Sequence, residues 1–212
     1  FFDERRNGGY AEYELVVMGG YRSASGGPVS SVVRTCRRLL PRADLPPFDG
    51  AASASNGNLL YVCGGWNITD ASPRNELLVL DLRGGALQQW GSRAPMLERR
   101  YHHCAEILAD GKLYVVGGTR PNASLIRAYD PTTNQWDSSL PPMLTQVSHA
   151  VSCAIGSRFF VAGGYDAEED EFIASLQVYG SLTRTWSFGA ALPRPLSHPT
   201  GVALQDGRFY VI

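Results

Sequence analysis

The sequence predicts an all-β protein in which one small antiparallel sheet is repeated along the chain. The first observation is a short alternating apolar run that ends in two glycines and occurs four times. The second is its period, because the final glycines of these runs are separated by 45, 53 and 46 residues. The third is the abundance of glycine (23) and proline (13), which is expected where tight turns join short strands. Self-similarity at about 40–50 residues is typical of repeat proteins.

The glycine pairs mark the repeats. They are Gly19-Gly20, Gly64-Gly65, Gly117-Gly118 and Gly163-Gly164. A fifth apolar run, Arg208–Ile212, has no pair after it. Since the sequence lacks an initiator Met and ends inside this run, we expect it to be a piece of a longer protein.

Composition limits the classes of partner. Of 212 residues, 44% are apolar and 18% are charged, which indicates a packed globular protein. The formal net charge is −1, so no basic surplus indicates nucleic acid or an anionic membrane as the partner. No apolar run approaches the roughly 20 residues of a membrane-spanning helix. We therefore expect neither a nucleic-acid partner nor a membrane partner.

The third repeat shows the expected order of elements most clearly. Four strands are predicted, at His102–Leu108, Lys112–Val116, Ser124–Asp130 and Gln135–Asp137. Asp110-Gly111 is a hairpin signal between the first two, and Pro131–Asn134 is a turn between the last two. We name such strands A, B, C and D in chain order. Antiparallel pairing of neighbours then follows from the short connections.

The same order is predicted in the neighbouring repeats. The second has strands at Ala51–Ser55, Leu59–Cys63, Glu76–Asp81 and Leu87–Gly91, and the fourth at His149–Ile155, Phe159–Ala162, Phe172–Tyr179 and Arg184–Phe188. We expect one domain over residues 1–212, with units at 1–48, 49–97, 98–145, 146–195 and 196–212. A single four-stranded sheet cannot bury two apolar faces alone, so radial stacking into a β-propeller is predicted.

The repeat unit resembles the kelch repeat. In that family an apolar strand ends in Gly-Gly, Tyr-Asp follows, and a Trp comes about six residues after the Tyr. The third copy has Gly117-Gly118, Tyr129-Asp130 and Trp136; the second has Leu80-Asp81 and Trp90; the fourth has Tyr179-Gly180 and Trp186. The resemblance implies a partial kelch-type β-propeller with about four to five visible blades. Residues expected to shape the blades are Gly19, Gly20, Gly64, Gly65, Trp90, Gly117, Gly118, Tyr129, Asp130, Trp136, Gly163, Gly164, Tyr179 and Trp186.

The resemblance also implies a function. Members of the family are mostly protein-binding modules, and many are substrate receptors of ubiquitin ligases that reach a cullin through other domains. Two alternatives stay open: an enzyme on a kelch-like propeller, such as a galactose-oxidase-like oxidase or a sugar epimerase, and an actin-binding or scaffold protein. Adjacent strand residues point to opposite faces, so His102-His103-Cys104 does not indicate a metal site. We expect no catalytic residues, no metal and no cofactor.

Binding is expected on the face formed by the D–A and B–C loops, which are longer and more varied than the turns at the other end. Counting fifteen residues back from the second glycine of each pair gives Gly50, His103 and His149 at the entrances of strand A. The alternative is that these histidines only hold the channel wall. Partner-binding residues implied by family position are Trp66, Arg100, Tyr101, His103, Arg120, His149, Tyr165 and His198. The acidic run Asp166–Glu171 is expected to be a solvated loop.

Location is the least constrained property. The four cysteines form no Cys-x-x-Cys pair and are expected to be buried free thiols. A cytoplasmic protein is therefore expected. Two glycosylation sequons, at Asn67 and Asn122, keep a secreted or extracellular protein as the alternative.

Overall fold

The computed structural model describes residues 15–17, 33–35, 40–41, 48–83, 89–119, 121, 123–196, 198–204 and 206–212. Its secondary structure is entirely β within these ranges, and every strand pair is antiparallel. The predicted all-β class is therefore confirmed. Among the described residues there is no helix with the length and apolarity needed to span a membrane.

Three sheets have the predicted four strands. The second repeat forms β5 (Ala52–Ser55), β6 (Leu59–Cys63), β9 (Leu77–Asp81) and β10 (Gly91–Arg93). The third forms β11 (His103–Ile107), β12 (Leu113–Gly117), β13 (Ile126–Asp130) and β14 (Gln135–Asp137). The fourth forms β15 (Val151–Ile155), β16 (Arg158–Ala162), β19 (Leu176–Gly180) and β20 (Thr185–Phe188). Spatial order within each sheet follows strands A to D, as short connections require.

The flanking repeats are smaller in the described part of the chain. The first contributes β1 (Leu15–Val17), β2 (Val33–Thr35) and β3 (Leu40–Pro41), which pair in that order. The last contributes β21 (Gly201–Ala203) and β22 (Phe209–Val211). Gly19 and Gly20 lie outside the described residues, as do Leu87 and Gln88 at the start of the predicted strand Leu87–Gly91, and β10 begins only at Gly91.

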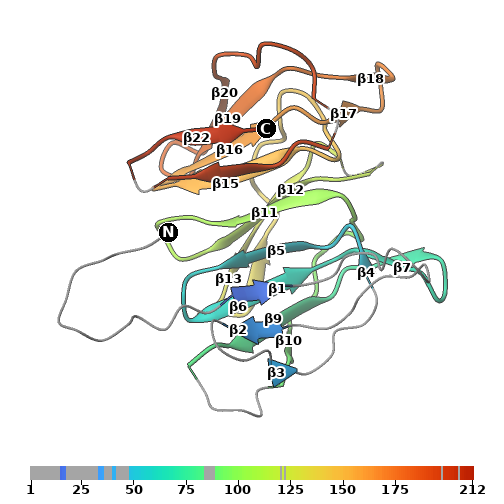
Figure 1. Ribbon diagram of the computed structural model, residues 1–212, viewed down its shortest axis with the longest axis vertical. Helices are drawn as coiled ribbons and strands as arrows, with labels where there is room; N and C mark the ends of the chain where they lie inside the picture. Colours follow the sequence, from blue (N-terminus) through green and yellow to red (C-terminus); the bar gives the residue numbers. More distant parts are fainter. Residues whose placement is uncertain are drawn as a thin grey trace.

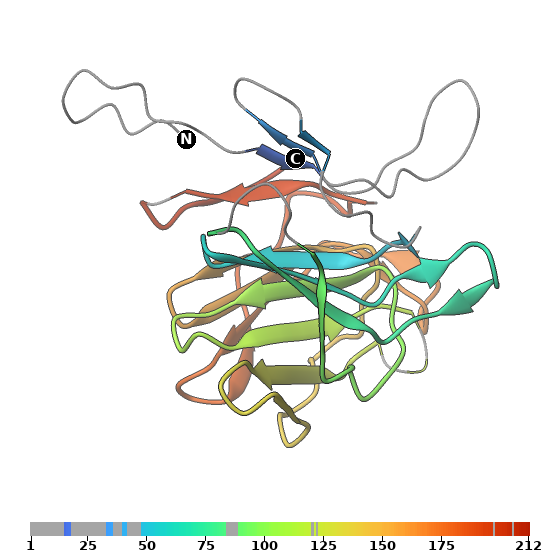
Figure 2. The ribbon, with the colours of Figure 1, turned by 90° about the horizontal axis from the view of Figure 1, so that it is seen from below.

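Two of the B–C connections are hairpins rather than irregular loops. β7 (Trp66–Asn67) pairs with β8 (Ser72–Pro73) and with β4 (Phe48–Asp49). β17 (Tyr165–Asp166) pairs with β18 (Glu171–Phe172) across the acidic run. Both hairpins project from the same edge of the stacked sheets (Figures 1 and 2). This edge carries the loops on which a binding site was expected.

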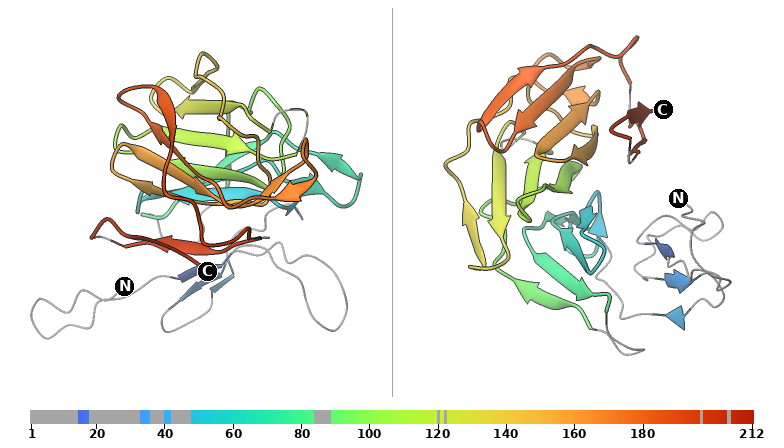
Figure 3. Two further views of the ribbon diagram at one scale, coloured as in Figure 1. Left: turned by 90° about the horizontal axis from the view of Figure 1, so that it is seen from above. Right: turned by 90° about the vertical axis from the view of Figure 1, so that its left-hand side faces the viewer.

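The sheets are arranged along an arc, so that each packs face to face with the next (Figure 3). Side chains of β12 alternate between the two contacts. Leu113 and Val115 pack with the second sheet, and Tyr114 and Val116 pack with the fourth. All five residues of β12 are buried. Burying a large apolar side chain contributes about 1.5–3 kcal/mol, so each sheet is stabilised chiefly by its two neighbours.

The tryptophans also lie at these contacts. The indole Nε1–H of Trp136 donates to the carbonyl oxygen of Ala94 in the preceding repeat, at 2.8 Å. Trp186 donates in the same way to Pro141, at 3.0 Å. Each ring also packs against the tyrosine of its own sheet, with centroids 5.3 Å apart for Tyr129 and 5.2 Å apart for Tyr179. Trp90 packs against Val62 on the side of its sheet that faces the first repeat.

The glycine pairs lie where the backbone of the next repeat passes closest. Gly117 has φ of +77°, and a Cβ atom placed on it would lie 2.7 Å from the carbonyl oxygen of Val147. The same atom on Gly118 would lie 2.9 Å from the carbonyl oxygen of Tyr101, in the loop that enters its own repeat. Real Cβ atoms do not approach backbone this closely, so the pair requires the absence of a side chain as well as a left-handed backbone.

This distinction can be measured with two matched substitutions. Gly111 also has φ of +77°, but no atom lies within 4 Å of its hypothetical Cβ. We expect Gly111→Ala to lose about 1–2 kcal/mol from backbone strain alone. Gly117→Ala should lose at least about 2 kcal/mol more, because Val147 must move. Urea unfolding followed by circular dichroism measures both losses, and equal losses would contradict the close-approach explanation.

Candidate functional site

Equivalent residues at the entrance of strand A form a column that runs from sheet to sheet. They are Gly50, His102, His149 and His198, and all four have positive φ, between +49° and +61°. The backbone N–H of His102 donates to the carbonyl oxygen of Gly50 at 2.7 Å, and that of His149 donates to His102 at 3.0 Å. Positive φ is uncommon for residues other than glycine and costs about 1–3 kcal/mol. Three histidines in this conformation show that the surrounding loops determine the backbone.

The histidine side chains lie against one another. The rings of His102 and His149 are stacked with centroids 3.9 Å apart, and His198 meets His149 edge-on at 4.4 Å. At the other end, Tyr101 lies 5.0 Å from His102 and 5.2 Å from Trp66. Five rings therefore form a continuous row, which we call the ring row (Trp66, Tyr101, His102, His149, His198). His198 is exposed and the other four are half-buried.

Two imidazoles of the ring row, those of His102 and His149, favour the neutral form. Burial lowers the pKa of His149 to about 4, and its neighbours His102 and His198 add to this effect. Burial also lowers the pKa of His102, against the opposing influence of the Asp49 carboxylate. Both rings therefore present π faces and lone pairs at neutral pH, without a positive charge.

His103 differs from its expected place. It is only 7% exposed, and its neighbour His102 takes the equivalent position in the column. The reason is the length of the A–B turn, which has three residues in the third repeat (Ala109-Asp110-Gly111) and two in the fourth (Gly156-Ser157). A fixed count back from the glycines is therefore one residue too short. The extra turn residue is visible in the sequence and was the signal that could have identified His102.

His103 instead faces a cysteine. Its Nε2 lies 3.4 Å from the Sγ of Cys63, an arrangement that resembles a nucleophile with its base. Burial raises the pKa of the Cys63 thiol to about 12 and lowers the pKa of His103 to about 3, with Arg100 contributing to the latter. Both shifts oppose the transfer of a proton from this thiol to this imidazole. The pair is inert as a thiolate source.

Arg100 also lies inside the molecule, at 0% exposure, and not on the loop face. Its guanidinium donates to the carbonyl oxygens of Gly117 and Leu125 at 3.0 and 2.7 Å, and to Glu98 at 3.2 Å. Arg127 binds the same carboxylate, with its Nε 2.9 Å from Oε1. Burial pushes the pKa of Glu98 upward, but the bonds from Arg127 and Arg100 hold it below its ordinary value. Arg100 therefore ties the D–A loop to β12 and to the B–C connection.

The other residues predicted from sequence also include both accessible and buried side chains. Tyr165 is half-buried, and its hydroxyl donates to Asp170 across the β17–β18 hairpin. Asp166 is buried and accepts from Gln146 at 3.3 Å, whereas residues 168 to 171 of the acidic run are exposed. Arg120 lies outside the described residues. Among those described, no three His, Cys, Asp or Glu side chains are placed to hold one metal ion.

The fold and this loop face define a kelch-repeat protein. Residues 50–212 match the KLHDC2/KLHL20/DRC7 Kelch-repeats domain, and the chain belongs to the kelch-repeat family. Similar curated proteins include Kelch-like protein 26 of Danio rerio, 27% identical over 82% of this chain, and Kelch-like protein 36 of Mus musculus, 30% identical over 73%. F-box/kelch-repeat protein At2g44130 of Arabidopsis thaliana is 28% identical over 68%.

The chain spans only 30%, 26% and 36% of these three relatives, respectively. Among solved structures, that of YjhT is similar in fold, with a TM-score of 0.59 and 19% identity. The match covers 73% of this chain and 54% of YjhT. At this identity the likeness concerns the fold alone. The kelch β-propeller predicted from the glycine pairs is thus confirmed, as a partial propeller.

The lowered pKa of His149 predicts a pH-dependent contribution to stability. Because the folded-state pKa of His149 lies near 4, below the ordinary 6.5, the unfolded chain binds more protons between these values. Stability is therefore fully present above pH 6.5 and falls as the pH drops toward 4. His149→Asn tolerates positive φ and does not titrate, so we expect it to lose less stability over this range. Thermal melts of both proteins at pH 7.5, 6 and 4.5 measure the difference, and parallel curves would contradict it.

Proposed function

We propose that this chain is a protein-binding module that uses the face of its D–A and B–C loops to hold a peptide segment of its partner. One observation carries the proposal: a row of five partly accessible rings, whose three histidines have an unfavourable left-handed backbone, on the edge from which both hairpins project. Aromatic residues are enriched at the centres of protein interfaces. A rigid sheet framework that presents loop side chains suits recognition.

The proposed site differs in part from the one expected from sequence. It retains Trp66, Tyr101, His149, Tyr165 and His198 and adds His102. Arg100 and His103 support these residues from inside the molecule. The proposal includes no catalytic step. Cys63 and His103, which resemble a nucleophile with its base, are buried, and burial raises the pKa of the thiol.

A narrower proposal is that the module selects substrates for a ubiquitin ligase in the cytoplasm. Its support is the name of one relative, an F-box/kelch-repeat protein. Cys63, Cys104 and Cys153 are free and buried, as is ordinary in a reducing compartment. Affinity purification of the protein that carries this chain should recover a cullin. Recovery of specifically bound proteins without a cullin would contradict this narrower role.

The binding face can be tested without knowledge of the partner. A displayed library of random 12-residue peptides is selected on the folded chain, and the affinities of the selected peptides are measured by fluorescence anisotropy. Trp66→Ala combined with His198→Asn removes both ends of the ring row, and we expect at least tenfold weaker binding. Leu182→Ala, at an exposed residue in the opposite C–D turn, should change affinity less than twofold. Unchanged binding to the double variant would reject this face.

A further inference from the structure

The charge of the loop face is set by which charged groups are buried. The guanidinium groups of Arg100 and Arg127 are buried and donate hydrogen bonds to Glu98 and to backbone carbonyl oxygens. Arg74 is paired with Asp70 and lies near Glu76. The lowered pKa values of His102 and His149 keep these two rings of the ring row uncharged at neutral pH. Among the described residues of the D–A and B–C loops, the exposed cations are Arg99 and Arg194.

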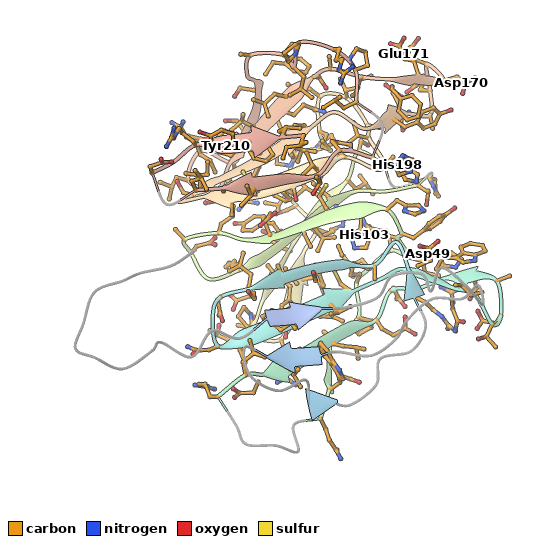
Figure 4. All side chains as sticks on the ribbon, viewed as in Figure 1. Asp49, His103, Asp170, Glu171, His198 and Tyr210 are labelled. Atoms are coloured by element: carbon orange, nitrogen blue, oxygen red, sulfur yellow. The ribbon has the colours of Figure 1, made fainter. Side chains whose placement is uncertain are left out.

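Carboxylates are more numerous on the same edge. The β17–β18 hairpin exposes four in succession: Glu168, Glu169, Asp170 and Glu171. Asp49 adds a fifth next to the ring row, where it acts on the pKa of both His102 and His149. Figure 4 shows Asp49, His198, Asp170 and Glu171 along one edge of the stacked sheets. The loop face therefore combines flat neutral rings with a surplus of negative charge.

The hairpin is built to hold this charge in place. Asp166 and Glu168 accept bonds from Gln146 of the neighbouring D–A loop, at 3.3 and 3.0 Å. The ring of Tyr165 packs on Phe172 with centroids 5.4 Å apart, and its hydroxyl binds Asp170. These contacts fix the tip of the hairpin relative to the loop that leads to His149. A ligand on the ring row would meet carboxylates in a defined position.

We propose that the loop face recognises an extended basic peptide segment, whose arginine or lysine side chains lie over the ring row and pair with the carboxylates of β17–β18. The inference rests on the proposed function and adds the chemical class of the partner. Guanidinium and ammonium groups are attracted to the faces of Trp and Tyr, by about 0.5–2 kcal/mol for each contact. Arginine also pairs with carboxylates through two parallel bonds. An acidic partner would meet like charges here, so the arrangement also discriminates against it.

Two labelled peptides test the proposal. One alternates arginine and serine over eight residues, and the other replaces each arginine with citrulline, which has nearly the same shape and no charge. Fluorescence anisotropy with the folded chain at pH 7.5 and about 0.15 M salt should show at least tenfold tighter binding of the arginine peptide. Trp66→Ala should weaken this binding at least threefold, since the ring contact is lost. Equal binding of the two peptides would overturn the proposal.

A pair of charge-matched variants separates this site from general attraction. The first, E168Q/E169Q/D170N/E171Q, removes four carboxylates from the hairpin and keeps side chains of similar shape. The second, D81N/D110N/D130N/D206N, removes four from turns at the opposite edge, where the amide oxygens can still accept the local backbone bonds. We expect the first to bind the arginine peptide at least fivefold more weakly and the second to bind within twofold of the unaltered chain. Equal losses would overturn the proposal.

The peptide library distinguishes failure of the basic-peptide proposal from failure of the proposed function. If library-selected peptides depend on Trp66 and His198 but are acidic or uncharged, the loop face binds protein and only the basic class is rejected. If those peptides are insensitive to both residues, the proposed function itself is rejected. Selected peptides that are rich in arginine or lysine and depend on the ring row would support both.

Discussion

The close passage of one repeat's backbone over the glycine pair of the previous repeat determines the rest of the structure. The N–H of the second glycine donates to a carbonyl oxygen in the next D–A loop: Gly65 to Arg100 at 2.8 Å, Gly118 to Val147 at 2.9 Å and Gly164 to Leu196 at 3.2 Å. In each case the acceptor lies two residues before a histidine of the column. The bond that spaces neighbouring sheets therefore also places the ring row. Packing and the candidate site share one geometric cause.

The buried ions reinforce this placement in the third repeat. Glu98 and Arg100 belong to the D–A loop, and Arg127 belongs to strand C of the next sheet. In the fourth repeat a neutral side chain holds the D–A loop to strand C. The amide of Gln177 accepts a hydrogen bond from the backbone N–H of Thr145 and donates one to its carbonyl oxygen, both at 2.9 Å. The D–A loop is thus held to strand C in both repeats, by an ion pair in the third and by a neutral amide in the fourth. Buried charge is therefore one solution among several and adds no special stability by itself.

The sequence was sufficient for the architecture and insufficient for the exact site. Alternating apolar residues and repeated Gly-Gly pairs report on buried strands and close backbone approach, both of which are local consequences of the repeat. Whether this loop arginine points inward is decided by the carbonyl oxygens of Gly117 and Leu125, which lie 17 and 25 residues further along the chain, so Arg100 could not be assigned from its neighbours. The hairpins at Trp66 and Tyr165 were missed because two-residue strands are too short to show alternation. His102 was missed because the A–B turn of the third repeat has one residue more than that of the fourth.

The left-handed backbone of the column at Gly50, His102, His149 and His198 also restricts how such a face can change its preference for ligands. Glycine, asparagine and aspartate adopt this conformation most easily, and β-branched residues are nearly excluded from it. Gly50 already occupies one position of the column, where a Cβ would lie 2.6 Å from Nδ1 of His102. Diversification at these four positions is thus confined to a few small or polar side chains. Novel specificities must arise mainly in the projecting hairpins, whose tips tolerate insertion and exchange.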